Sequence, residues 1–290
     1  MPLYDLHSHW GTEALYPLRT PEARARQYDV WRTEARFWTK QEMADYFRKN
    51  DVKAMLDLGF SRHEPMHRVR ELHDEIFAFE REHPDVTLGM WLQLSPATGR
   101  EGIDEIERCR KLGRGVVGLV VSAMGNKLPL TDPAYAPFYD YCVQVGMPAM
   151  FMVGYTGVGA GTPGGDGIEL ELNHPRDVDA IAARYPKLTI IAGRPAWPWQ
   201  SEMIATLLHK GNVYAELHGV SPKRLTDEFK REIRGRLKHK IMFGLDFPML
   251  RYEKIKADWI QEGYPDDVLE GIFHGNVERL WPSLRNGESR

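Results

Sequence analysis

The stretch KIMFGLDFP at residues 240–248 has the pattern of a buried strand with one acidic side chain near its end. In an extended segment, Met242, Gly244 and Asp246 share one face, and the large apolar residues between them take the other. A carboxylate inside a folded core costs free energy unless a positive partner compensates its charge. The stretch therefore predicts a strand that ends where Asp246 meets a cation.

Similar apolar runs recur along the chain and alternate with amphipathic, helix-like stretches. The eight predicted strands lie near residues 2–6, 52–58, 86–94, 115–121, 147–153, 188–193, 212–217 and 240–245. Strands that alternate with helices are joined by parallel crossovers, and eight of them favour a closed (β/α)₈ barrel of the TIM type, an α/β fold. A doubly wound sheet is the rival architecture, but no GxGxxG motif follows the first strand.

Composition narrows the classes of function. The 290 residues suit one barrel domain over residues 1–290, and a 42% hydrophobic content is enough for a sizeable core. A net charge of −3 gives no reason to expect nucleic acid or an anionic membrane as a partner. The sequence opens without a signal-peptide pattern, and no apolar run approaches about 20 residues. We expect a cytoplasmic protein in which Cys109 and Cys142 are buried thiols.

Two segments are too long to be tight connections after a strand. Residues 10–39 are rich in Trp, Tyr and Arg, and residues 154–174 contain a glycine-rich run. Because both follow predicted strands, we expect them to lie over the catalytic face as lid insertions. The glycine run lacks the Gly-Lys-Ser/Thr ending of a phosphate-binding loop, which favours a substrate-covering loop.

The first predicted strand ends in DLHSH at residues 5–9. Strand residues two apart share a face, so His7 and His9 can point together into the mouth of the barrel. In a closed barrel the first and last strands are neighbours, which places Asp246 beside the two imidazoles. Two imidazoles and a carboxylate are a natural ligand set for a divalent metal ion.

These motifs resemble those of the amidohydrolase-related family. The resemblance is carried by His-x-His after the first strand and Gly-x-Asp-Phe-Pro after the last, and it extends over nearly the whole chain. Further matching stretches are YPKLTIIA at 185–192, WPWQ at 197–200, GNVY at 211–214 and HGNVERL at 274–280. The family includes aminocarboxymuconate-semialdehyde decarboxylase, resorcylate-type decarboxylases and lactone hydrolases. The resemblance implies a metal-dependent barrel in which Asp246 ligates the metal and moves a proton; it also allows a homodimer.

The chain departs from the family pattern at two ligand positions. Val153 stands where the family has a metal-binding His after strand five, and Arg194 stands where it has a His after strand six. A guanidinium stays protonated near neutral pH and cannot act as a base or a metal ligand. Residues 116–122 also offer no Lys that could become a bridging carbamate.

Strand seven offers replacements for the missing ligands. In NVYAELH at residues 212–218, Tyr214, Glu216 and His218 share one face. An inward acid and imidazole are costly in an empty core but reasonable beside a metal. The predicted metal ligands are His7, His9, Glu216, His218 and Asp246, and the predicted cofactor is one or two divalent ions of Zn, Mn or Fe. The alternative is that Glu216 forms a structural ion pair with Arg194 while His218 bonds to the backbone.

The predicted partner is a small organic substrate. Arg194 and Asp246 are the predicted catalytic residues, with Arg194 clamping a substrate carboxylate or stabilising negative charge. Further predicted substrate contacts are Tyr155, His174, Trp197, Trp199 and His63. HEPMH at residues 63–67 matches the zinc-protease pattern HExxH, but Pro65 is poorly placed inside the helix that the motif needs.

Three functions remain open at this stage. The favoured one is a metal-dependent hydrolase or non-oxidative decarboxylase acting on an organic acid, ester, lactone or acyl derivative. The second is a non-haem di-iron monooxygenase on the same barrel, because His and carboxylate ligands suit iron and oxygen activation does not need the missing base. The third is a barrel without catalytic activity that only binds a ligand.

Overall fold

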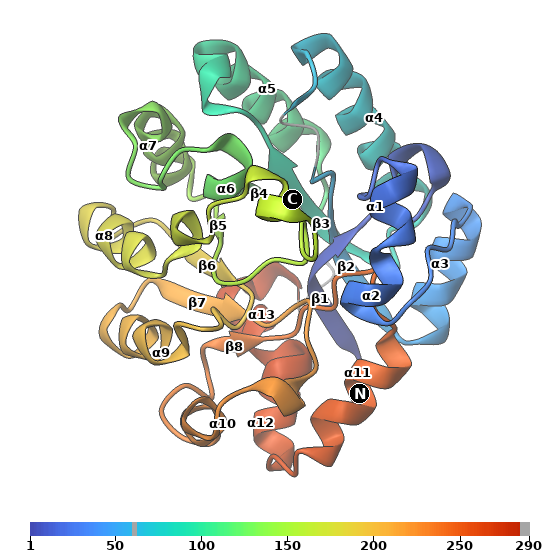
Figure 1. Cartoon of the computed structure of the whole chain (residues 1–290). Coiled ribbons are helices and arrows are strands. Elements are labelled where there is room, and N and C mark those ends of the chain that lie inside the picture. The colour runs from blue at the N-terminus through green and yellow to red at the C-terminus, as the bar shows by residue number, and fades with distance from the viewer. Residues whose placement is uncertain (60–62, 285–290) are drawn as a thin grey trace.

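The computed structural model describes residues 1–59 and 63–284 as eight strands surrounded by helices (Figure 1). The strands are β1 (Leu3–His9), β2 (Val52–Asp57), β3 (Thr87–Gln93), β4 (Val116–Val121), β5 (Ala149–Met152), β6 (Ile190–Gly193), β7 (Val213–Glu216) and β8 (Ile241–Met242). They form one parallel sheet in sequential order. This order confirms the predicted (β/α)₈ barrel.

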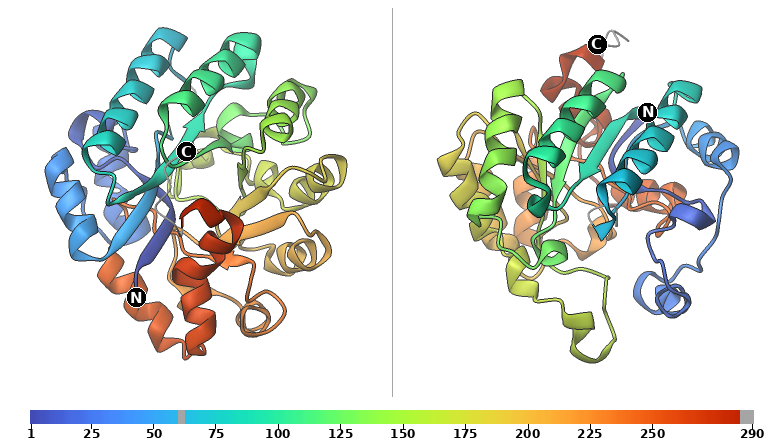
Figure 2. Two further views of the ribbon diagram at one scale, coloured as in Figure 1. Left: turned by 180° about the vertical axis from the view of Figure 1, so that it is seen from behind. Right: turned by 90° about the horizontal axis from the view of Figure 1, so that it is seen from above.

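Helices surround the sheet, most of them along its outside and some across its two ends (Figures 1 and 2). They are α1 (Pro21–Ala25), α2 (Gln27–Trp31), α3 (Lys40–Lys49), α4 (Met66–Glu82), α5 (Gly99–Leu112), α6 (Ala123–Asn126), α7 (Ala136–Val145), α8 (Arg176–Arg184), α9 (Gln200–His209), α10 (Asp227–Arg234), α11 (Tyr252–Gln261), α12 (Asp266–Glu270) and α13 (Asn276–Leu280). The π-helical turn Gly271–Gly275 joins the last two. Across the described residues, no helix is both long and apolar enough to cross a membrane.

Backbone hydrogen bonds bring the segment after β8 against β1. The amide of Leu6 donates to the carbonyl of Phe243 over 3.0 Å, and the amide of Asp246 donates to the carbonyl of His7 over 2.8 Å. We call this contact between β1 and the segment after β8 the seam. Asp5 strengthens it, because its buried carboxylate accepts the backbone amides of His7 and Leu245. The seam places the predicted carboxylate beside the predicted imidazoles.

The core has an inner and an outer layer. Met242 belongs to the cluster inside the barrel, whereas Ile241, Phe243 and Leu245 pack between sheet and helices. The predicted alternation along residues 240–248 is therefore confirmed. A fully buried large apolar side chain contributes about 1.5–3 kcal/mol, so the outer layer holds each helix against the sheet. Cys109 and Cys142 are buried free thiols in this layer, as predicted.

The two predicted insertions project from the same end of the barrel, opposite the C-terminus (Figure 2). Residues 10–39 contain α1 and α2, and residues 154–174 contain the short turns Pro163–Gly167 and Leu170–Asn173. The insertions touch each other. The guanidinium of Arg26 lies 3.6 Å from a carboxylate oxygen of Asp166. A Cβ atom added at Gly157 would lie only 2.3 Å from the ring of Trp31, so these two segments are in direct contact.

Candidate metal centre

Two imidazoles meet at the end of β1. The register of β1 on β2 shifts between Asp5 and Ser8. Leu6 still points into the inner core, and beyond it His7 and His9 bring their Nε2 atoms within 3.3 Å of each other. The two rings are almost perpendicular, at 89°. His7 is buried and His9 is partly open to the rim.

Asp246 completes a three-residue cluster with this pair. Its Oδ1 atom lies 3.2 Å from Nε2 of His9. The residue has a φ of +79°, in the left-handed region, where a residue other than glycine costs about 1–3 kcal/mol. That conformation is held by the seam to β1, and it directs the carboxylate toward the imidazoles.

The spacing of these three donors fits a divalent metal ion. Nitrogen and oxygen ligands about 2.0–2.1 Å from a tetrahedral ion stand about 3.3–3.4 Å from each other. The separations in the cluster, 3.3 Å for His7–His9 and 3.2 Å for His9–Asp246, are close to this value. A set of two imidazoles and one carboxylate suits Zn, Mn or Fe.

Asp57 sets the orientation of the His9 ring. Asp57 is the residue paired with His9 in the β1–β2 register, and its Oδ1 atom bonds to Nδ1 of His9. The side chain of Gln93 donates to the other oxygen of Asp57 over 2.9 Å. With a metal bound and the ring proton on Nδ1, His9 would turn the lone pair of Nε2 toward the ion, which is the usual arrangement of a metal-binding histidine.

Charge is unbalanced in this cluster. Burial lowers the pKa of His9, but the carboxylates of Asp57 and Asp246 on either side of the ring outweigh it and raise the pKa to about 10. His9 is thus the only imidazole of the three-residue cluster that its neighbours push toward a positive charge. A divalent cation between the donors would satisfy the same two carboxylates.

Asp57 and Gln93 were missed by the sequence analysis. The available signal was an acid at the end of the second apolar run, which parallel pairing brings beside the end of the first strand. No pattern within a single strand indicates such a contact.

A second cluster lies on β7 and the residue after β6. Nδ1 of His218 lies 2.5 Å from Oε1 of Glu216, and the backbone amide of His218 donates to Oε2 over 3.0 Å. Nε2 of His218 accepts a hydrogen bond from Nε of Arg194 over 3.0 Å. Burial and the guanidinium of Arg194 lower the pKa of His218 to about 3, so the ring is neutral at ordinary pH.

The two clusters are adjacent. The rings of His7 and His218 are stacked, with centroids 3.8 Å apart. All five predicted ligands therefore lie at one end of the barrel, namely His7, His9, Glu216, His218 and Asp246. The alternative in which Glu216 pairs directly with Arg194 differs from the geometry, because His218 stands between them.

The side of β5 that faces the barrel interior carries sulfur instead of imidazole. Val153, at the position of the family's expected ligand, packs in the outer layer, while Met150 and Met152 point into the inner core. The thioether of Met150 lies 3.3 Å from Nδ1 of His7. Within β5 as described, no nitrogen or oxygen side chain faces the cluster, in agreement with the predicted departure.

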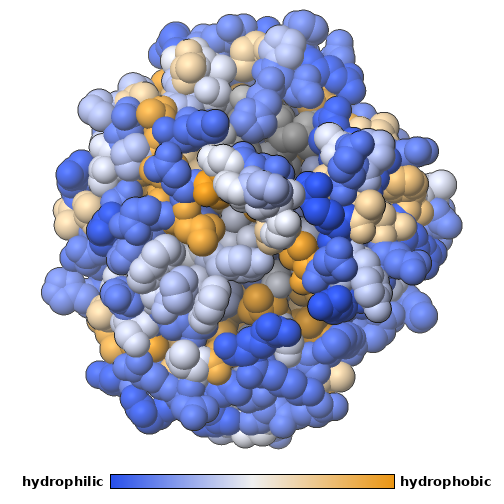
Figure 3. Space-filling view, in the orientation of Figure 1, coloured by the Kyte–Doolittle hydropathy of each residue, from blue (hydrophilic) through white to orange (hydrophobic). Residues whose placement is uncertain are grey.

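Two of the predicted substrate contacts, Tyr155 and Trp197, lie near the guanidinium of Arg194. Arg194 donates from one terminal nitrogen to the carbonyl of Tyr155 over 3.4 Å, and the Tyr155 ring meets the edge of Trp197 at 5.8 Å. Trp197 is 55% exposed. In the space-filling view of this face, apolar side chains gather near the centre inside a hydrophilic border (Figure 3).

The other predicted substrate contacts lie farther out. His174 packs on Trp199 and lines a groove between α8 and α9. His63 is exposed and precedes α4, whose N-cap residue is Pro65. His67 lies in α4 and His63 does not, so the HExxH residues do not share a helix, as the placement of Pro65 predicts.

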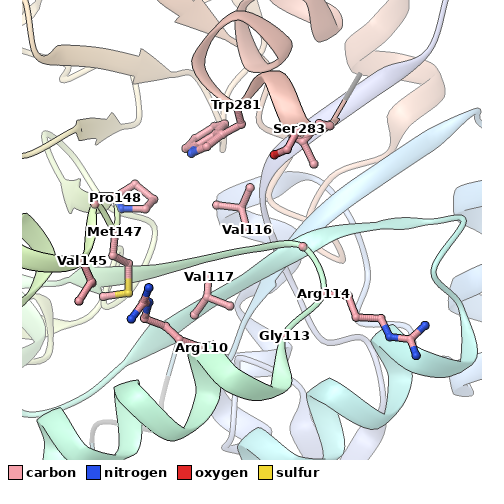
Figure 4. A pocket seen from close by; sticks show the side chains of 13 residues that line it. Arg110, Gly113, Arg114, Val116, Val117, Val145, Met147, Pro148, Trp281 and Ser283 are labelled. Carbon is pink, nitrogen blue, oxygen red and sulfur yellow. The ribbon is translucent and has the colours of Figure 1, made fainter. Parts of the chain in front are cut away.

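Two further features lie away from the mouth. A cavity of about 120 Å³ at the amino-terminal end of the strands is lined by Val116, Pro148, Trp281 and their neighbours (Figure 4). Among its described lining residues there is no carboxylate or imidazole. Between α4 and α5, His73, Glu105 and Cys109 cluster in the outer layer, where Arg108 forms two 2.8 Å hydrogen bonds to the carboxylate.

Comparison with known proteins gives a family. The family model described as Amidohydrolase matches residues 39–283, most of the chain. No curated protein matches the chain.

Solved structures share the fold at low sequence identity. An uncharacterised TIM-barrel protein from Bordetella bronchiseptica is 18% identical, with a TM-score of 0.76 over 97% of this chain and 99% of that one. The 5-carboxyvanillate decarboxylase of Sphingomonas paucimobilis is 16% identical, with a TM-score of 0.71 over 97% and 99% of the two chains. A dihydroxybenzoic acid decarboxylase from Polaromonas, solved with manganese and 2-nitroresorcinol, is 16% identical, with a TM-score of 0.69 over 98% of each chain. None of these three is described as an oxygenase.

Proposed function

The chain belongs to the amidohydrolase family, and we propose that it is a metal-dependent enzyme that removes or transforms the carboxylate of a small organic acid. Decarboxylation without an oxidant is the reaction that the site supports best. The observation that carries the proposal is the placement of the three donors His7, His9 and Asp246, at metal-ligand spacing, on the rim that also presents Arg194.

His7, His9 and Asp246 would hold the ion, and Asp57 would keep His9 in the tautomer that can bind it. A bound divalent ion supplies a Lewis acid that polarises a carboxylate or carbonyl oxygen. Zn, Mn and Fe all suit the donor set, and the Polaromonas decarboxylase with manganese supports a divalent ion.

Arg194 would orient the substrate. Its Nε–H donates to His218, and one terminal nitrogen donates to the carbonyl of Tyr155. The remaining N–H groups of the guanidinium can bind an anion. A guanidinium binds a carboxylate through two parallel hydrogen bonds and stabilises negative charge that develops there. The exposed ring of Trp197 would form part of an apolar wall.

Within the described part of the rim, the imidazole beside Arg194 has no free nitrogen, which favours decarboxylation over hydrolysis. Hydrolysis needs a group that takes a proton from water. Both nitrogens of His218 are already bonded and Arg194 cannot accept a proton, so Asp246 would have to act as this base while it also holds the metal. In decarboxylation the carbon–carbon bond breaks, carbon dioxide leaves, and the electron pair left on carbon takes up a proton. Asp246, which is buried beside His9 at this end of the barrel, is the residue placed to hand on that proton.

An assay for carbon dioxide release tests the proposal. Protein loaded with Mn²⁺ or Zn²⁺ is given a panel of hydroxybenzoates and related acids without oxygen, and release of carbon dioxide is expected with at least one acid. Lactones and esters form a second panel. Turnover of the second panel alone would replace decarboxylation by hydrolysis, and turnover that requires iron and oxygen would contradict both.

A further inference from the structure

We propose that Glu216 and His218 are positioning residues for Arg194 and are not metal ligands, and that together they make the site selective for a carboxylate. The inference rests on the proposed function, because Arg194 is there the group that binds the substrate. It assigns a role to two of the five side chains at the rim and divides the site into a metal half and a substrate half.

Both ring nitrogens of His218 already have partners. Glu216 takes the Nδ1 proton at 2.5 Å, which leaves the lone pair on Nε2, and that lone pair accepts Nε–H of Arg194 at 3.0 Å. A metal ion at Nε2 would have to displace the guanidinium. A cation at that point already compensates the buried carboxylate, so this cluster needs no ion from outside.

The backbone around Glu216 is shaped for this carboxylate. Its Oε2 atom accepts the amide of His218, and a Cβ atom added at Gly244 would lie 2.0 Å from the same oxygen. Glycine on the neighbouring strand segment thus provides the space in which the carboxylate lies. Glu216 and His218 are both fully buried, whereas Arg194 reaches the rim. An incoming molecule therefore meets Arg194 and not the two residues behind it.

The geometry fixes which tautomer supports Arg194. Nε of Arg194 can only donate, so Nε2 of His218 must accept and the ring proton lies on Nδ1. One oxygen of Glu216 accepts the His218 amide, and the other accepts this Nδ1 proton. If an amide replaced the carboxylate, its NH₂ group would face Nδ1 and move the ring proton to Nε2. Two N–H donors would then oppose each other at Arg194. The isosteric change Glu216→Gln should therefore release the guanidinium without opening a cavity.

The experiment compares Glu216→Gln and His218→Ala with wild type and with His9→Ala, all loaded with Mn²⁺. Bound manganese is measured by elemental analysis, and affinity is measured by calorimetry for benzoate and for its neutral isostere benzamide. Glu216→Gln and His218→Ala are expected to keep the wild-type manganese content and to bind benzoate about tenfold more weakly, the effect of about one charge-assisted hydrogen bond. Their affinity for benzamide should stay at the wild-type value. His9→Ala should lose manganese.

Two further variants separate positioning from folding. His218→Gln places an amide oxygen within reach of Arg194 and should recover part of the benzoate affinity. Gly244→Ala places a methyl group against the carboxylate of Glu216 and should lower the affinity for benzoate in the same way. Either result supports the positioning role even if His218→Ala does not fold.

Loss of manganese in Glu216→Gln or His218→Ala would make these residues ligands and overturn the inference. Equal losses of benzoate and benzamide affinity, or no loss of either, would also overturn it. If the wild type held manganese but did not prefer benzoate to benzamide, the substrate part of the proposed function would fail with it. If the wild type held no manganese, zinc or iron, the metal part would fail, whatever the variants bind.

Discussion

The two halves of the barrel rim carry the same kinds of side chain, but they differ in the group that compensates the charge of their buried carboxylates. On the β1, β2 and β8 side, Asp57 and Asp246 flank His9, and no guanidinium or ammonium group lies among the described donors. On the β6 and β7 side, Arg194 stands at the end of the chain of hydrogen bonds that begins at Glu216. The second half contains its own cation, and we propose that the first half takes a metal ion from outside.

Imidazole and carboxylate groups that lie close together are therefore not enough to identify a metal site. What distinguishes the halves is whether a guanidinium already occupies the imidazole nitrogen, as Arg194 does at His218. The cluster of His73, Glu105 and Cys109 between α4 and α5 supports the same distinction, because Arg108 neutralises its carboxylate. We therefore expect metal only in the first half of the rim.

The largest effect is expected from His9→Ala. His9 lies within 3.3 Å of both other donors, so its removal leaves two ligands that are no longer held around one point. Metal content should fall to background and turnover should be lost. Elemental analysis of purified protein measures this. The exposed His67 is the control, and His67→Ala should change neither quantity. Full metal content in His9→Ala would contradict the assignment of the metal to His7, His9 and Asp246.

A smaller loss is expected from Asp57→Asn. The change removes the carboxylate that orients His9 but leaves the three donors in place. Partners of this kind contribute about 10–100-fold in metal affinity. Competition with a chelator measures the dissociation constant. Gln93→Leu removes only the hydrogen bond to Asp57 and should have a milder effect. An unchanged affinity in Asp57→Asn would mean that the His9 ring is held by other contacts.

The α4–α5 cluster gives a prediction about pH. Burial opposes ionisation of Glu105, but hydrogen bonds from His73 and Arg108 lower its pKa to about 2, below the ordinary value of 4.5. The ionised group therefore stabilises the fold above pH 4.5, and this stability is lost as the pH falls from 4.5 toward 2.

Glu105→Gln should lower the free energy of unfolding by about 2 kcal/mol at neutral pH and remove this acid dependence. Chemical denaturation at several pH values measures both. Glu101→Gln is the matched control, since that residue pairs with Arg70 on the exposed side of α5. A steep acid transition that persists unchanged in Glu105→Gln would show that other carboxylates dominate.

The smallest effect is expected from Arg26→Ala. The pair with Asp166 joins the two insertions, but both side chains are open to water, and such pairs contribute about 0–1 kcal/mol. Thermal unfolding should shift little, because the contact between Trp31 and Gly157 remains. A large loss of stability would show that the ion pair, and not the apolar contact, holds the insertions together.

Much of the fold follows from local sequence patterns. The predicted strands agree with the observed ones to within a few residues, because alternation within a strand shows up in the sequence. The last strand differs most. A strand was expected over residues 240–245, but β8 covers only Ile241–Met242, since the following residues turn to bond with β1.

The candidate site was predictable only in part. His7 and His9 lie at the end of β1, and Asp246 follows β8; the closed order of the strands, which the sequence predicted, brings these two places together. Asp57 escaped notice because its role comes from the neighbouring strand. The contact of Arg194 with His218 depends on a left-handed backbone conformation at Arg194, with a φ of +82°, that no periodicity signals. His174 lies after a long insertion whose path the sequence pattern does not determine.

The most direct test of the account is anomalous diffraction at the manganese edge from crystals grown with Mn²⁺. We expect a peak between Nε2 of His7, Nε2 of His9 and Oδ1 of Asp246, with Arg194 still bonded to His218. A peak on Nε2 of His218 with the guanidinium moved away, or a rim in which only water lies between the three donors, would contradict it.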